Sequence, residues 1–76
     1  MNASLESLTP EQQKDFRKAE WVFETHGTVN RVHVVIHMEA LENLVKLELA
    51  DNVDERARDR IKALRSAIKT KVLRGY

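Results

Sequence analysis

The sequence predicts a small all-α protein of three helices, in which the last two form an antiparallel hairpin. Three observations lead to this fold class. Apolar residues recur every three or four positions over most of the chain. Helix start and stop signals separate these apolar stretches. The 76 residues include two Gly, one Pro and no Cys, so no linker divides the chain. We expect a frayed N-terminus over residues 1–8 and a single helical domain over residues 9–76.

The first helix is expected to begin at Thr9 and to end just before Gly27. Thr9 and Gln12 have the spacing of a capping box, and Pro10 suits a first turn because its missing N–H would have no intrahelical partner. Gly27 is typical of the position that follows a helix end. Trp21 falls outside the apolar face of this helix. That face consists of Phe16, Ala19, Val22, Phe23 and His26.

Residues 28–50 allow two interpretations, of which a continuous helix is the leading one. As a helix, the segment has two apolar stripes, and a helix with two stripes lies between two neighbours. The first stripe consists of Met38, Leu41, Val45 and Leu49, and the second of Ala40, Leu44 and Leu47.

The alternative fold is α-β-α-α, with residues 31–38 as a strand paired across a dimer. This stretch is β-branched and alternates, with Arg31, His33 and His37 on its polar side. A lone strand leaves backbone groups unpaired unless a second copy pairs with it. In this form the order strand, helix, helix resembles ribbon–helix–helix repressors. The residues between the last two helices lack that family's Gly-containing turn, so none of its functional residues is transferred.

The last helix is expected over residues 53–74. Its apolar positions alternate at spacings of four and three, which is typical of a helix–helix seam. Asn52 and Glu55 form a plausible capping pair at its start. The short link of residues 50–52 predicts that the preceding helix folds back against it. The seam consists of Val53, Ala57, Ile61, Leu64, Ile68 and Val72.

Charge is distributed unevenly, although the net charge is only +1. The balance is −4 over residues 1–52 and +5 over residues 53–76. The basic residues of the last helix form two rows, one on each side of its seam. One row consists of Arg58, Lys62, Arg65 and Lys69, and the other of Arg56, Arg60, Lys71 and Arg74. Such a row either follows a nucleic-acid backbone or forms ion pairs with a neighbouring helix.

The leading functional hypothesis is a non-catalytic binding or assembly protein that forms a homodimer or docks on a protein partner. Its contacts are expected at Trp21, a residue type enriched at interfaces, and at the second stripe, Ala40, Leu44 and Leu47. The alternative is a nucleic-acid-binding dimer that uses the row Arg58, Lys62, Arg65 and Lys69.

Other functions find little support in the sequence. No Gly-rich phosphate loop and no Cys nucleophile are present, so we expect no enzyme, no cofactor and no small-molecule substrate. His33 and His37 have metal-ligand spacing, but no Cys can complete a site, and we expect no metal. The start of the chain does not resemble a secretory signal, and no window has the length of a membrane span. We therefore expect a cytoplasmic protein without a membrane contact.

Overall fold

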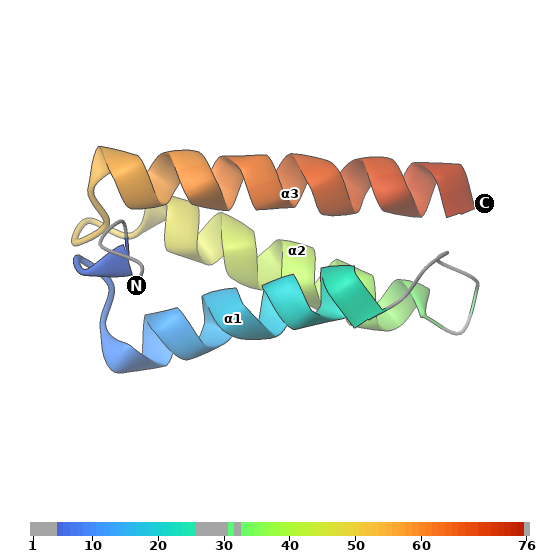
Figure 1. Cartoon of the computed structure of the whole chain (residues 1–76), viewed down its shortest axis with the longest axis horizontal. Coiled ribbons are helices and arrows are strands. Elements are labelled where there is room, and N and C mark those ends of the chain that lie inside the picture. The colour runs from blue at the N-terminus through green and yellow to red at the C-terminus, as the bar shows by residue number, and fades with distance from the viewer. Residues whose placement is uncertain (1–4, 26–30, 32, 76) are drawn as a thin grey trace.

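The computed structural model describes residues 5–25, 31 and 33–75. Three helices form a bundle: α1 (Pro10–Thr25), α2 (Val34–Leu49) and α3 (Glu55–Gly75). Helix α2 packs against both other helices, whereas α1 and α3 contact each other much less (Figure 1). Each helix runs antiparallel to the next, as the short α2–α3 link requires. The predicted all-α fold with a C-terminal helical hairpin is confirmed.

Helix α1 begins as the sequence predicts. The Thr9 backbone N–H donates to Oε1 of Gln12 at 2.9 Å, and the Gln12 N–H donates to Oγ1 of Thr9 at 3.1 Å. This reciprocal pair is a capping box, and it satisfies two backbone donors that would otherwise have no partner. Phe16, Ala19 and Val22 of the predicted face are buried. The expected end of the helix, His26 and Gly27, lies outside the described residues.

The strand interpretation of residues 31–38 is wrong for residues 34–38, which belong to helix α2. No strand occurs anywhere in the described part of the chain. The β-branched residues form no strand here, because a lone strand would need a second copy to pair its backbone groups. A helix satisfies these backbone groups internally and buries one face against α1 and α3.

Helix α3 is capped by a residue other than the one expected. Oδ1 of Asp54 accepts a hydrogen bond from the Ala57 N–H at 2.9 Å, so Asp54, and not Asn52, is the capping side chain. Asn52 lies two residues too early, and its side chain bonds elsewhere. The seam of α3 is confirmed, with Leu64 and Val72 partly buried and its other members in the core.

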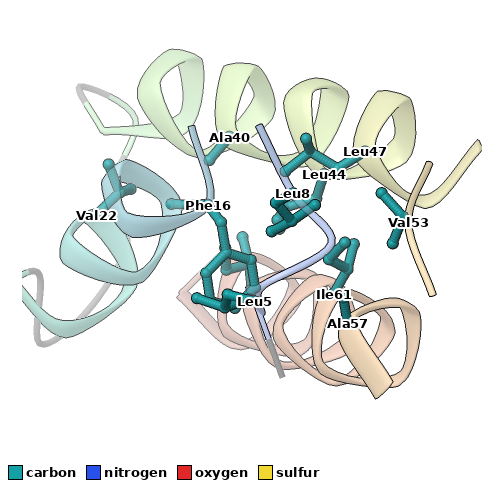
Figure 2. Close-up of a cluster of buried hydrophobic side chains, with 12 residues drawn as sticks. Leu5, Leu8, Phe16, Val22, Ala40, Leu44, Leu47, Val53, Ala57 and Ile61 are labelled. Carbon is teal, nitrogen blue, oxygen red and sulfur yellow. The ribbon is translucent and has the colours of Figure 1, made fainter. Parts of the chain in front are cut away.

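The core lies between the three helices and is closed at one end by residues that precede α1 (Figure 2). Leu5 and Leu8 are both buried and belong to the same core cluster as Phe16, Leu44 and Ile61 (Figure 2). The expectation of a frayed N-terminus therefore does not hold for residues 5–8, and residues 1–4 lie outside the described residues. The buried apolar residues are Leu5, Leu8, Phe16, Ala19, Val22, Ala40, Leu44, Leu47, Val53, Ala57, Ile61 and Ile68.

Polar side chains fasten this N-terminal segment in place. Nε2 of Gln13 donates to the carbonyl oxygens of Leu5 and Leu8 at 3.2 and 3.1 Å. From the α2–α3 link, Nδ2 of Asn52 donates to the Ser7 carbonyl at 2.9 Å, and the N–H of Asp54 donates to Ser7 Oγ at 3.1 Å. Backbone groups near the core thus gain partners, which lets the two leucines stay buried.

Candidate interaction surface

The second stripe of α2 was predicted to contact a partner, but its side chains lie in the core of the bundle. Leu44 is fully buried, and Ala40 and Leu47 are almost so. Ala40 faces α1, where its small side chain lines a hollow beside Val22. These three side chains cannot reach a partner while the bundle is folded, because they form its core.

Three members of the first stripe are exposed, whereas the fourth, Leu41, is partly buried against the core, and Val35 joins the exposed residues. Leu49 keeps 75% of its surface exposed, Val35 67%, Met38 49% and Val45 42%. With Glu42, also exposed, these residues follow spacings of three, four, three and four, which is the pattern of a coiled-coil seam. We call Val35, Met38, Glu42, Val45 and Leu49 the α2 outer face. The second stripe, which the sequence suggested for a partner, is therefore buried, and the exposed apolar residues of α2 lie on the α2 outer face instead.

Charged residues flank the α2 outer face. Glu39 and Lys46 are exposed and follow Met38 and Val45 directly along the chain, so both lie along the same edge of the face. Seven residues separate them, which is two helical turns or about 10 Å. An acidic and a basic side chain thus stand at the two ends of one edge.

Trp21 lies on the outer side of α1 and is 60% exposed. Its neighbours in the core-facing direction, Ala19 and Val22, are buried, whereas Arg17 and Lys18 beside it are exposed. The structure thus agrees with the prediction that Trp21 points away from the main apolar face. Because Trp21 is mostly exposed, it remains a separate candidate contact.

The basic row next to α2 is divided in its roles. Arg65 forms an ion pair with Glu48 at 2.9 Å. Arg58 donates to the carbonyl oxygens of Glu48 and Ala50 at 2.9 and 3.1 Å. Both arginines therefore hold α3 against the end of α2, Arg65 through the predicted kind of interhelical ion pair and Arg58 through backbone carbonyl oxygens. Lys62 and Lys69 remain exposed.

The second basic row packs against α1 in the same manner. Arg60 pairs with Glu20 at 3.3 Å, and its guanidinium lies 5.1 Å from the centre of the Phe16 ring. Lys71 donates to the Phe23 carbonyl, and its ammonium lies 4.7 Å from the centre of the Phe23 ring. Arg56 and Arg74 of this row are exposed. Each row thus has two residues that hold helices together and two that face solvent.

His37 is a core residue that the sequence analysis did not identify as one. It is fully buried, and its Nδ1 donates to the His33 carbonyl oxygen, 2.9 Å away. His33 and His37 thus meet through a ring nitrogen and a backbone oxygen. Among residues 5–25, 31 and 33–75, no group of three or more His, Cys, Asp or Glu could hold a metal ion.

A small hollow lies between α1 and α2, lined by Val22, Ile36 and Ala40 and edged by Asp15 and Glu39. Its volume of about 50 Å³ is far below the 300–1,000 Å³ of typical ligand pockets.

None of the described helices is long and apolar enough to cross a membrane. Searches of protein-family models, curated protein sequences and solved structures found no match to the chain.

Proposed function

We propose that this chain is a non-catalytic helical assembly module that acts through the α2 outer face, by homo-dimerisation or by docking on a protein partner. The observation that carries the proposal is the coiled-coil spacing of exposed apolar residues on a helix whose opposite face already fills the core. None of these exposed side chains belongs to the buried core of the described residues.

The chemistry of the α2 outer face favours another helix as its occupant. Side chains spaced three and four residues apart form knobs that fit between the side chains of a facing helix. Removing them from water on association is favourable by about 25 cal/mol per Å² of apolar surface. Contiguous apolar surface rimmed by charged residues is a mark of protein-interaction sites. Glu39 and Lys46 supply such a rim here.

Nucleic-acid binding has weaker support. Of the row Arg58, Lys62, Arg65 and Lys69, both arginines already bond to α2, through Glu48 and neighbouring carbonyls. Two exposed lysines on one helix are fewer than the phosphate contacts that such a row was expected to make. We therefore keep protein association as the proposed function.

The proposal is tested by site-specific photo-crosslinking in the cells that produce the protein. A photoreactive residue replaces Met38, in the α2 outer face, and in a matched variant it replaces Ala63, which is exposed on α3. We expect covalent adducts from position 38 and few from position 63. Adducts that form equally at both positions, or at neither, would contradict the proposal.

A further inference from the structure

We infer that the occupant of the α2 outer face is a second copy of this chain, with its α2 helix antiparallel to the first. The proposed register places Met38 opposite Leu49 of the second copy, and Glu42 opposite Val45 of the second copy. The inference rests on the proposed function, because it names the partner of the same face.

The register follows from the positions on the face. In an antiparallel helix pair, the two alternating sets of seam positions face each other across the interface. Val35, Glu42 and Leu49 form one set here, and Met38 and Val45 form the other. Matching the sets leaves only registers that differ by whole heptads. The register with Met38 opposite Leu49 and the register with Val35 opposite Val45 each bury three apolar side chains of every copy.

Charge separates this register from its neighbours. In it, Glu39 lies beside Lys46 of the second copy, and the two-fold axis forms the same pair again on the other side. A shift by one heptad in one direction brings the two copies of Glu39 together, and a shift in the other direction brings the two copies of Lys46 together. Like charges placed opposite each other are destabilising. The proposed register is therefore the one with complementary charges.

A parallel arrangement is disfavoured by Glu42. In a parallel in-register pair each seam position faces its own copy, so the two Glu42 carboxylates would meet in the middle of the interface. In the antiparallel register Glu42 instead faces Val45 of the second copy, next to Lys46 of that copy. Its flexible stem can cover the apolar surface while the carboxylate approaches that ammonium.

The size of the face sets the strength of the expected association. Helix α2 has 16 residues and is therefore about 24 Å long. One helix pair of this length buries less area than the large apolar interfaces of obligate dimers. The monomer core is already complete without a partner. We expect a dimer that dissociates on dilution and whose subunits stay folded.

Charge variants test the pairing of Glu39 with Lys46. Glu39→Lys and Lys46→Glu each turn both complementary pairs into like-charge pairs, and sedimentation equilibrium is expected to show dimerisation weakened about tenfold. An equimolar mixture of the two variants restores opposite charges across the interface. We therefore expect the mixed dimer to be tighter than either variant alone. Equal affinities for mixed and unmixed samples would overturn the inference.

Disulfide trapping tests the register, since the natural chain has no cysteine. Met38→Cys mixed with Leu49→Cys is expected to give a mixed disulfide under mild oxidation. Met38→Cys alone should crosslink slowly, because eleven residues, or about 16 Å, separate its two copies in this register. Leu73→Cys is the control on α3, where Leu73 is 70% exposed, close to the value for Leu49.

The outcomes separate the two proposals. A mixed disulfide that forms faster than the Met38→Cys and Leu73→Cys homodimers supports the register. Rapid crosslinking of Met38→Cys with itself indicates a parallel pair and overturns the inference. A natural chain that stays monomeric at millimolar concentration also overturns it. In either case, photo-crosslinked adducts to another protein at position 38 would leave the proposed function standing.

Discussion

Replacing Leu8 by alanine tests whether the segment ahead of α1 belongs to the folded bundle. Leu8 is 4% exposed and belongs to the same core cluster as Leu5 and Leu44. A buried Leu→Ala change removes apolar contacts and leaves a cavity, which costs about 3 kcal/mol. The whole domain is expected to be stable by roughly 4–11 kcal/mol, so this loss is a large fraction of the total.

Urea unfolding followed by circular dichroism measures the effect. With a slope of roughly 1 kcal/mol per molar urea, the loss corresponds to a midpoint lower by about 3 M. Fluorescence of Trp21 is a poor probe, because its ring is mostly exposed in the folded state. The matched control is Leu73→Ala, which shortens an exposed leucine on α3 and is expected to change stability by less than about 0.5 kcal/mol.

The two interpretations of this segment differ widely in their consequence. A frayed segment would make Leu8→Ala as neutral as Leu73→Ala. A Leu8→Ala variant within about 0.5 kcal/mol of the natural chain would therefore refute the packing of residues 5–8 and the role of the Gln13 and Asn52 hydrogen bonds that fasten them.

Three further predictions concern the cap, the tryptophan and the basic row. Asp54→Ala is expected to lower the free energy of unfolding by about 1 kcal/mol in the same urea assay, because it removes the α3 cap. Asp54→Asn can still cap and should be nearly neutral. Equal losses of stability in the two variants would contradict the cap. Trp21→Ala is expected to leave both stability and dimerisation nearly unchanged, and loss of the dimer in sedimentation would place the interface on α1 instead. If the chain binds duplex DNA, fluorescence anisotropy should show that the double variant Lys62→Gln/Lys69→Gln has a shallower slope of log affinity against log salt concentration. The expected difference is about 2 units, since each phosphate contact contributes about 0.9. An unchanged slope would exclude these two lysines as phosphate contacts.

Local signals in the sequence predicted the helices and several of their details. The capping box of Thr9 and Gln12 depends on residues three apart, and the α3 seam depends on a regular spacing that only a helix places on one side. Both are decided within a few turns of chain. The division of each basic row into paired and exposed members could not be foreseen, because it depends on where Glu20 and Glu48 lie on neighbouring helices.

The α2 helix shows where sequence reasoning stops. Both of its stripes are apolar, so the pattern alone does not say which one is buried. The structure buries Ala40, Leu44 and Leu47 together with His37, whereas Met38 and Leu49 stay outside. Ala40 faces α1 and, with Val22, lines the small hollow between the two helices. That choice depends on the shapes of all three helices at once.

Three helices, the α3 seam and the two apolar stripes of the middle helix can thus be predicted from local sequence patterns. Periodicity and capping depend on residues close together in the chain, so they do not depend on how the helices pack against one another. The exposure of one face of α2 and the burial of Leu5 and Leu8 follow instead from the packing of the whole bundle. Both depend on contacts between residues far apart in the chain, whose packing no local pattern encodes.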